Sequence, residues 1–219
     1  MKTFKVLSAL LTYPDLALLS HAGELDAALA SENLLPADDR RAIGQFVADI
    51  ARLDLLDAQE RYVALFDRHR SLSLHLYEHI HGESRDRGQA MVELAALYRL
   101  HGVEIGANEL PDYLPLFLEF LSLLPLKAAV SLLAEAVHVV AALRLRLVER
   151  GSPYAAVMHA VETLAAKPPD RAAIDEVLAM LKPEGDSLAA LDGQWEEEAV
   201  RFAAADAPLG RAAAASCAR

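Results

Sequence analysis

Cysteine is almost absent from this chain of 219 residues: the only one is Cys217. A single cysteine cannot form an internal disulfide, and it cannot supply the several thiolates that structural zinc sites use. Because it stands in a low-complexity stretch, it is also a poor candidate for a catalytic nucleophile. The sequence therefore excludes a disulfide framework and a cysteine-based metal site.

Basic side chains are scarce relative to acidic ones, with 21 lysines and arginines against 32 aspartates and glutamates. The formal net charge of −11 argues against a general nucleic-acid-binding protein, since such proteins neutralise phosphates with basic side chains. An acidic surface serves either solubility alone or the attraction of a cationic partner. Composition leaves both interpretations open.

Aromatic residues make up only 6% of the chain and β-branched residues are few, whereas alanine and leucine dominate. This composition favours helices over sheets. A chain of 219 residues is also long enough to bury one substantial core. We therefore predict an all-α fold, built as a single-domain helical bundle.

Long uninterrupted hydrophobic runs are missing as well. Residues 6–11 form an apolar run after Lys2 and Lys5, but Pro14 follows soon, so the run is too short for a signal peptide. The most apolar region, residues 114–147, is interrupted by charged side chains and a proline, so no transmembrane helix is expected. We expect a soluble, cytoplasmic protein.

Prolines, glycines and capping residues divide the chain into helical segments with helical hydrophobic spacing. We predict helices over residues 3–12, 15–30 with a break at Gly23, 36–53, 55–66, a turn or two before Gly82, 84–101, 112–124, 126–149, 153–166 and 170–181. Asp54 and Asp112 are the expected N-caps of the helices that follow them. The helix after Asp112 is apolar on almost every side, which predicts that it is buried all round at the centre of the bundle.

The composition of the sequence changes after Pro183. An acidic run is followed by an alanine-rich stretch without a coherent apolar stripe. Such a stretch cannot bury enough apolar surface to fold. We therefore predict a helical domain over residues 1–184 and a mobile, low-complexity tail over residues 185–219.

A histidine-rich segment raises the possibility of metal chemistry. His75, Glu78 and His79 match the H-x-x-E-H pattern of inverted zinc metallopeptidases, in which the histidines bind zinc and the glutamate acts as base. The pattern fixes only three positions in a histidine-rich segment, so chance is a strong competitor. A zinc-dependent hydrolase is kept as the alternative function, against partly exposed histidines that bond to neighbouring carboxylates.

Some charged residues lie where a plain packing surface does not require them. Glu119 lies in the most apolar helix, where a charge is costly unless it is paired, so it forms either a structural ion pair or part of a binding groove. Arg85 and Arg87 oppose the dipole at a helix start. A nearby carboxylate, Asp112 or Glu109, is the expected partner.

Two blocks of the sequence resemble a known family. YVALFDRHRSLSLHLYEHIHGESRDRGQAM at residues 62–91 and ELPDYLPLFLEFLSLLP at residues 109–125 are similar to the NarJ-type assembly chaperones of respiratory nitrate reductase, whose members are often called its delta subunit. The similarity is dense over residues 62–125 and extends over residues 4–181. Several matched blocks over some sixty residues are far more specific than the H-x-x-E-H pentamer.

This resemblance implies a fold of the TorD and DmsD type and a chaperone rather than an enzyme, with no cofactor of its own. The implied partner is the N-terminal segment of the catalytic (alpha) subunit of nitrate reductase. Such a chaperone keeps the apoenzyme competent for molybdenum-cofactor insertion before membrane attachment. The implied protein does not bind nucleic acid and does not insert stably into the membrane.

The wider family marks its peptide site with a Glu-Pro-x-Asp-His motif. The segment at residues 109–113 takes that place here, but its proline is displaced and a tyrosine stands where the histidine would be. We expect a groove between residues 62–70 and the helix that begins at Asp112. The predicted peptide-binding residues are Tyr62, Phe66, Arg68, Tyr77, Arg85, Arg87, Glu109, Leu110, Pro111, Asp112, Tyr113, Leu116 and Glu119.

Overall fold

A computed structural model describes residues 1–81, 84–106 and 109–180. In these ranges the chain forms eleven α-helices and one 3-10 helix, and no strand. They are α1 (Lys2–Leu11), α2 (Leu16–Ser20), α3 (Ala22–Glu32), α4 (Ala37–Ile50), α5 (Leu55–Phe66), η1 (Arg70–Leu72), α6 (Leu76–His81), α7 (Arg85–Leu100), α8 (Leu114–Leu123), α9 (Leu126–Glu149), α10 (Tyr154–Thr163) and α11 (Arg171–Met180). The predicted all-α fold is confirmed, whereas the predicted tail at residues 185–219 lies outside the described residues.

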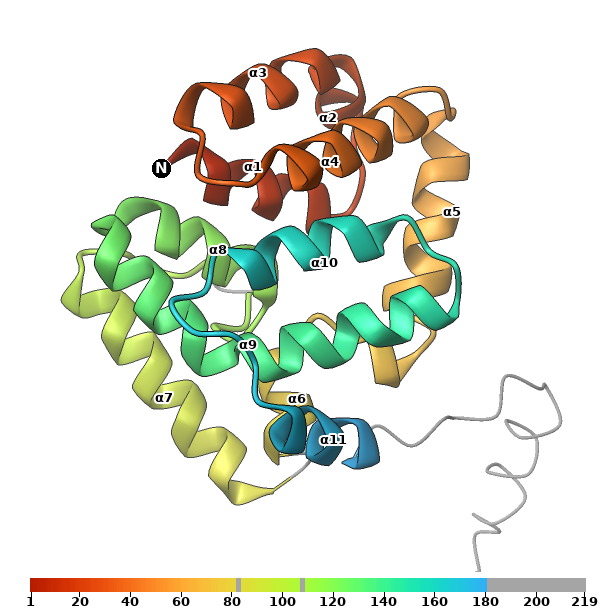
Figure 1. Cartoon of the computed structure of the whole chain (residues 1–219). Helices are drawn as coiled ribbons and strands as arrows, with labels where there is room; N and C mark the ends of the chain where they lie inside the picture. Colours follow the sequence, from red (N-terminus) through yellow and green to blue (C-terminus); the bar gives the residue numbers. More distant parts are fainter. Residues whose placement is uncertain (82–83, 107–108, 181–219) are drawn as a thin grey trace, which may run out of the picture. The chain divides into compact units, whose positions relative to one another are not determined.

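Four helices, α1, α8, α9 and α10, pack against one another, and the other helices pack around them (Figure 1). The first helix, α1, packs on α8 and α3, while α10 lies between α4 and α9. Ala/Leu-rich faces permit this close approach, and the buried aromatic side chains Phe4, Phe46, Phe120 and Tyr154 fill the space between the helices.

The central helices match the expectation in most respects. Most of α8 is buried, because apolar side chains cover nearly all of its surface, but Glu119 and Leu123 point to solvent. The prediction that α8 is buried all round is therefore wrong along one edge. Among the described helices, α9 is long and apolar enough to span a membrane. This is weak evidence for a membrane span, because the buried core helix of a soluble protein can have the same length and composition. Its inner face, from Ala129 to Leu147, is packed in the core.

Helix boundaries follow local chemistry in most places. The Asp54 carboxylate caps α5 by accepting a hydrogen bond of 2.9 Å from the Asp57 amide. Gly102 and Gly151 follow α7 and α9 with positive φ angles of 75° and 63°, the conformation in which glycine commonly ends helices.

The boundary between α2 and α3 differs from the prediction. The break lies at His21 and not at Gly23, which is inside α3. The His21 Nδ1 atom lies 2.8 Å from the carbonyl oxygen of Ala17, so this side chain bonds to the last turn of α2. A glycine inside a helix costs only about 1 kcal/mol relative to alanine, which packing readily offsets.

Candidate functional site

Asp112 is fully buried and connects three segments of the chain. Its carboxylate lies 3.2 Å from Nδ1 of His75, accepts a hydrogen bond of 3.1 Å from the Tyr77 amide, and lies 3.8 Å from the Arg87 guanidinium. The Asp112 carbonyl also accepts the Leu76 amide at 3.0 Å. The prediction that Asp112 caps the helix following it is wrong: Tyr113 holds that position, and Asp112 caps the distant helix α6.

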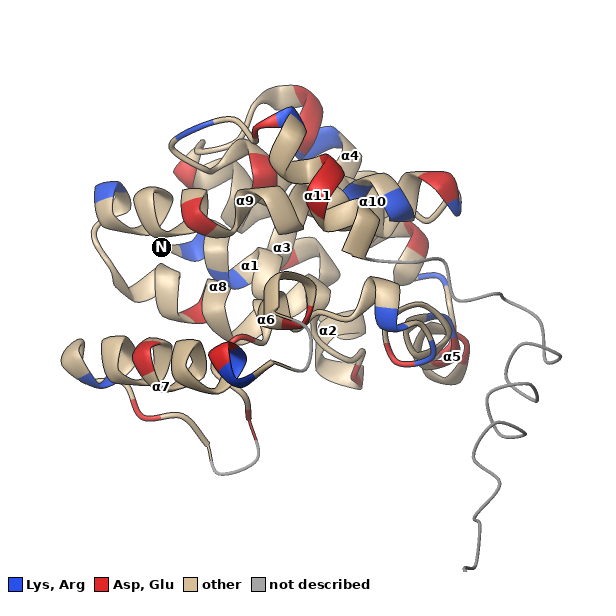
Figure 2. Cartoon of the chain, turned by 90° about the horizontal axis from the view of Figure 1, so that it is seen from below, with Lys and Arg blue, Asp and Glu red and all other residues tan. Residues whose placement is uncertain are grey.

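Arg87 supplies the balancing charge for this buried carboxylate. Its guanidinium also bonds to Glu78 at 3.3 Å, so one arginine joins the start of α7 to α6 and to Asp112. Acidic and basic positions accordingly lie side by side where α7 begins, next to α6 (Figure 2). Of the two carboxylates expected near the arginines, Asp112 is the partner, while Glu109 and Arg85 are exposed.

Backbone hydrogen bonds fix the segment before α8 against the segment before α6. The Leu114 amide donates to the Leu74 carbonyl at 2.8 Å, and His75 and Tyr113 form an isolated antiparallel bridge. The Tyr98 hydroxyl donates to the Pro111 carbonyl at 2.8 Å. These bonds position the His75 and Tyr113 rings, whose centroids lie 5.3 Å apart.

The histidines of the H-x-x-E-H pattern do not form a metal site. His79 is only 1% exposed, its Nε2 atom bonds to the Ser73 carbonyl at 2.7 Å, and burial lowers its pKa. His75 is engaged with Asp112. Across the part of the chain that the structure describes, no group of three histidine, cysteine, aspartate or glutamate side chains could hold a metal ion. The structure therefore does not support the alternative of a zinc hydrolase.

A small cavity, here called the tyrosine pocket, lies between the end of α5 and the start of α8. Its volume is about 250 Å³, and it is lined by Tyr13, Tyr62, Phe66, Asp67, Ser73, Leu74, His75 and Tyr113. This is the place between residues 62–70 and α8 where the sequence predicted a groove, although Leu116, Glu109 and Glu119 do not line it.

A second cavity, here called the α6–α9 cleft, has a volume of about 280 Å³ and lies among α6, α7, α8 and α9. It is mostly apolar and carries two exposed carboxylates, Glu93 and Glu135. Its lining residues are Leu76, Tyr77, Ile80, Glu93, Leu94, Leu97, Phe117, Leu132, Glu135 and Ala136. Burial first, and then the charges of Asp112, Glu135 and Glu93, raise the pKa of Tyr77, so its phenol stays neutral.

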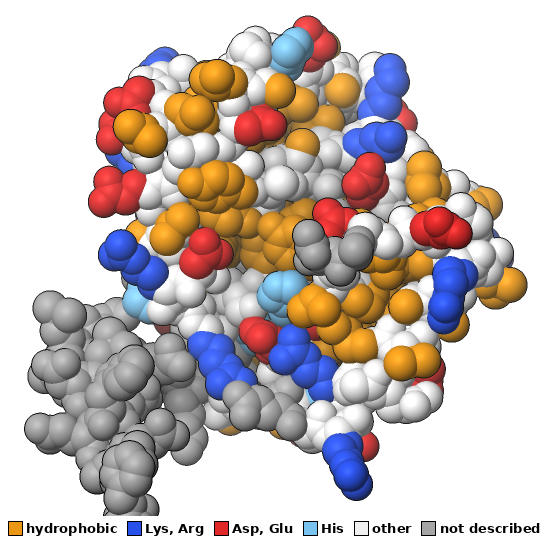
Figure 3. Space-filling model, turned by 180° about the vertical axis from the view of Figure 1, so that it is seen from behind, with side chains coloured by type: hydrophobic (Ala, Val, Ile, Leu, Met, Phe, Trp, Pro, Cys, Tyr) orange, Lys and Arg blue, Asp and Glu red, His pale blue; other side chains and the backbone are white. Residues whose placement is uncertain are grey.

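The two cavities lie next to each other, separated by the segment that leads into α6 and by the start of α8. His75 lines the tyrosine pocket and Leu76 lines the cleft, while Tyr113 and Phe117 face the two cavities about one turn apart along α8. One face of the molecule shows hydrophobic side chains gathered near its middle with charged side chains around them (Figure 3).

The predicted site residues fall into three groups. Tyr62, Phe66 and Tyr113 line the tyrosine pocket, and Tyr77 lines the cleft. Buried or half-buried residues that line neither cavity are Arg87, Pro111, Asp112 and Leu116. Exposed residues outside both cavities are Arg68, Arg85, Glu109, Leu110 and Glu119.

Sequence reasoning missed several lining residues of both cavities. Tyr13 and Asp67 of the tyrosine pocket were not selected, nor were Glu93 and Glu135 of the cleft. The one usable signal was Glu135, a carboxylate in a largely apolar stretch of sequence.

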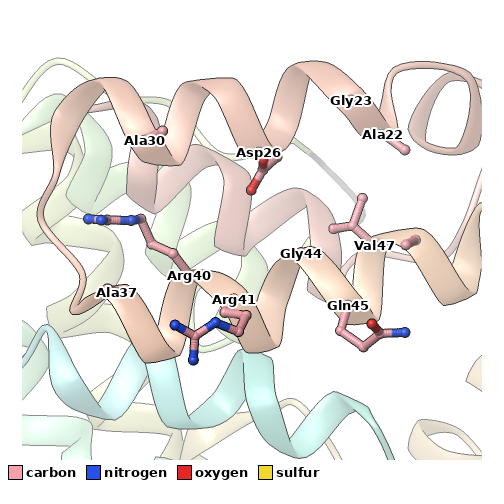
Figure 4. A pocket seen from close by; sticks show the side chains of 11 residues that line it. Ala22, Gly23, Asp26, Ala30, Ala37, Arg40, Arg41, Gly44, Gln45 and Val47 are labelled. Carbon is pink, nitrogen blue, oxygen red and sulfur yellow. The ribbon is translucent and has the colours of Figure 1, made fainter.

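A third, larger groove of about 660 Å³ lies between α3 and α4, away from all predicted residues. Its walls consist mainly of small side chains such as Ala30 and Gly44, with Asp26 of α3 directed toward α4 and with Arg40 and Arg41 along one side (Figure 4). Arg40 bonds to the Leu35 carbonyl at 2.8 Å, so it is held by the chain itself.

Comparison with known proteins gives consistent matches. Residues 32–160 match the family model described as "Nitrate reductase delta subunit". The "Nitrate reductase molybdenum cofactor assembly chaperone NarJ" of Escherichia coli K12 is 46% identical over 197 residues, covering 90% of this chain and 83% of that protein.

Two further relatives have similar coverage of their own length. The "Probable nitrate reductase molybdenum cofactor assembly chaperone NarW" of Escherichia coli K12 is 40% identical over 204 residues, covering 92% of this chain and 84% of that protein. The "Probable nitrate reductase molybdenum cofactor assembly chaperone NarJ" of Bacillus subtilis 168 is 31% identical over 157 residues, covering 72% and 84%.

Proposed function

The chain belongs to the nitrate reductase delta subunit family, and from that membership we propose that it is an assembly chaperone for respiratory nitrate reductase. It binds the N-terminal segment of the catalytic (alpha) subunit. While bound, it keeps the apoenzyme competent for insertion of the molybdenum cofactor. It acts in the cytoplasm, before the catalytic subunit becomes attached to the membrane.

The relatives support a chaperone rather than an enzyme. Three relatives at 31–46% identity are named as molybdenum cofactor assembly chaperones, and none of these names describes a catalyst. Asp112 and the residues joined around it, His75, Tyr77, Glu78 and Arg87, are here called the Asp112 cluster. Their polar groups bond to one another, which suits a structural role better than a catalytic one.

The α6–α9 cleft is the observation that carries the peptide-binding proposal. An amphipathic helix is recognised by a groove that accepts its apolar side chains at helical spacing. In this cleft Ile80, Leu97 and Phe117 offer apolar surface, and Ile80 is 38% exposed. Glu93 and Glu135 offer carboxylates at the same cavity for basic residues of the segment. A basic, amphipathic peptide therefore matches the cleft in both respects.

The Asp112 cluster holds α6, one wall of the cleft, in place. The helix α6 spans only Leu76–His81, and a helix of that length is not stable alone in water. Capping by Asp112 and the Arg87–Glu78 bond hold it in place. The cluster thus positions Tyr77 and Ile80 at the cleft without contacting the peptide itself.

Isothermal titration calorimetry with a synthetic peptide of the N-terminal segment of the catalytic subunit tests the proposal. We expect the wild-type chain to bind, and Ile80→Ser to weaken binding roughly tenfold, because about 1–2 kcal/mol of apolar contact is lost. Leu56→Ser is the matched control, since Leu56 is 76% exposed and lies outside the cleft. Equal affinities of the two variants would place the peptide elsewhere, and no binding by wild type would refute the proposed partner.

A second pair of variants tests the carboxylates of the cleft. Glu93→Gln combined with Glu135→Gln should cost about 1 kcal/mol, roughly fivefold in affinity, as is typical of partly exposed ion pairs. The loss should shrink in high salt, because the Debye length falls from about 10 Å at 0.1 M to about 3 Å at 1 M. Glu24→Gln on α3, which is exposed and outside both cavities, is the control.

A further inference from the structure

We propose that the tyrosine pocket is an aromatic cage for one cationic side chain, the ammonium group of a lysine or the guanidinium group of an arginine. The inference rests on the proposed function in one respect, because the cation is expected to belong to the bound N-terminal segment. Within that function it assigns a separate subsite, next to the α6–α9 cleft.

Four aromatic side chains line the pocket: Tyr13, Tyr62, Phe66 and Tyr113. The Tyr13 and Tyr62 rings meet edge to face at a centroid distance of 5.6 Å, and Tyr62 and Phe66 lie 4.9 Å apart. Tyr113, beside His75, completes the lining. A cation within about 6 Å of a ring centroid is attracted by the negative face of the ring. Several rings around one small cavity therefore favour a cationic occupant.

The hydroxyl groups of the pocket point to the same conclusion. The Tyr62 hydroxyl donates its only hydrogen to the Leu11 carbonyl at 2.9 Å. It also lies 3.0 Å from the Tyr113 hydroxyl, so in this pair Tyr113 must be the donor. Both phenol hydrogens are therefore used within the protein, and the remaining capacity of both oxygens is to accept. Lysine and arginine are donors without acceptors, which suits such a pocket.

Asp67 adds a negative charge to the lining. Its side chain is exposed and makes no hydrogen bond or ion pair with any residue that the structure describes. Burial is the main cause that raises the pKa of both Tyr62 and Tyr113, and the charge of Asp67 raises both further. The carboxylate is thus close enough to act on both phenols, and a cation between these groups would find its counter-charge.

Size and charge favour a single cationic side chain over the other occupants. Drug-sized ligands occupy pockets of about 300–1,000 Å³, so a cavity of about 250 Å³ suits a single side chain. An anionic side chain would be repelled by Asp67, and an aliphatic one would gain nothing from Asp67 or from the accepting phenol oxygens. A cationic side chain complements the rings, the accepting phenol oxygens and Asp67 at once.

Tyr13 is the residue of choice for a test, because it is 47% exposed and its substitution leaves the core intact. Tyr13→Leu removes the aromatic face but keeps apolar bulk, and Tyr13→Phe keeps the face. We expect Tyr13→Leu and Asp67→Asn to weaken binding of the N-terminal peptide about three- to tenfold, and Tyr13→Phe to stay within about twofold of wild type.

A peptide series shows whether the effect comes from one cation. Each lysine of the peptide is replaced by norleucine and each arginine by citrulline, one at a time. One of these peptides should bind wild type more weakly and should lose its sensitivity to Tyr13→Leu, as a double-mutant cycle requires for a direct contact. If wild type binds the parent peptide but Tyr13→Leu acts equally on all peptides, or not at all, the cage is refuted while the proposed function stands.

A probe that needs no peptide decides the remaining case. Nα-acetyl-lysine methylamide and Nα-acetyl-arginine methylamide are titrated into the protein, and aromatic proton shifts are followed by NMR. Saturable shifts of the Tyr13 ring signals are expected with one or both cations and not with the norleucine derivative, and Tyr13→Leu should weaken them. If the cations shift the signals no more than norleucine does, the cage is refuted whether or not the peptide binds.

Discussion

Replacing Asp112 by alanine should destabilise the chain far more than the loss of an ordinary helix cap. The substitution removes the acceptor of hydrogen bonds from His75 and from the Tyr77 amide, and the counter-charge 3.8 Å from Arg87. Hydrogen bonds to a charged group contribute about 1.5–3 kcal/mol each. The two bonds together give an upper figure of about 3–6 kcal/mol.

Two effects reduce that figure. Removing a fully buried carboxylate also removes its desolvation cost, and Arg87 keeps its bond to Glu78 after the substitution. His75 is 30% exposed, so water can replace the lost bond to its ring. We therefore expect a loss of about 3 kcal/mol, at the lower end of the range for breaking a buried pair. In a domain of this size the melting temperature should fall by about 6–12 °C.

The assay is equilibrium unfolding in urea, followed by far-UV circular dichroism. The matched control is Asp54→Ala, because Asp54 caps α5 through one hydrogen bond of 2.9 Å and is exposed. That control should lose only about 1 kcal/mol. Asp112→Asn keeps an acceptor for the Tyr77 amide and should recover part of the difference. If Asp112→Ala costs no more than Asp54→Ala, the buried cluster does not stabilise the fold as argued.

Two other predictions concern buried polar groups. Burial lowers the pKa of His79 below its ordinary value of about 6.5, so the unfolded chain binds more protons than the folded chain as the pH falls. The free energy of unfolding should therefore drop by up to about 1.4 kcal/mol per pH unit below about pH 6.5. His79→Gln should flatten this slope in urea titrations between pH 7 and pH 5.5, and an unchanged slope would assign it to other groups. Tyr98→Phe removes the hydroxyl that donates to the Pro111 carbonyl at 2.8 Å and should cost about 1 kcal/mol in the same assay, with Tyr13→Phe as an exposed control that costs almost nothing.

Most of the helical architecture could be predicted because its signals are local. Pro36 stands directly before α4, Gly151 follows α9, and the bounds of α9 agree with the prediction at both ends. Alanine- and leucine-rich segments between such residues have few alternatives to a helix. The burial of α8 was likewise predictable, since almost every position in it is apolar.

The partners of charged side chains could not be predicted in the same way. An aspartate before an apolar run is a normal N-cap signal, but Asp112 caps a helix some thirty-five positions earlier in the chain. Which carboxylates reach a cavity depends on how each helix is rotated against its neighbours. Glu93, Glu135 and Glu119 are all exposed, but the first two line the α6–α9 cleft, whereas Glu119, in an apolar stretch of sequence, lines neither cavity.

The same backbone contacts shape both cavities, so the residues around Asp112 affect the binding sites as well as the stability of the fold. The bonds between Leu74 and Leu114 and between Leu76 and Asp112 fix the segment that separates the tyrosine pocket from the cleft. His75 faces one cavity and Leu76 the other, so a shift of this segment would change both at once. A peptide that fills the cleft and places a cation in the pocket would therefore have to match the spacing between the two cavities. The backbone bonds of Leu76 with Asp112 and of Leu74 with Leu114 fix that spacing. On the proposed function, selectivity for one partner segment would follow from this fixed distance between an apolar anchor and a charge.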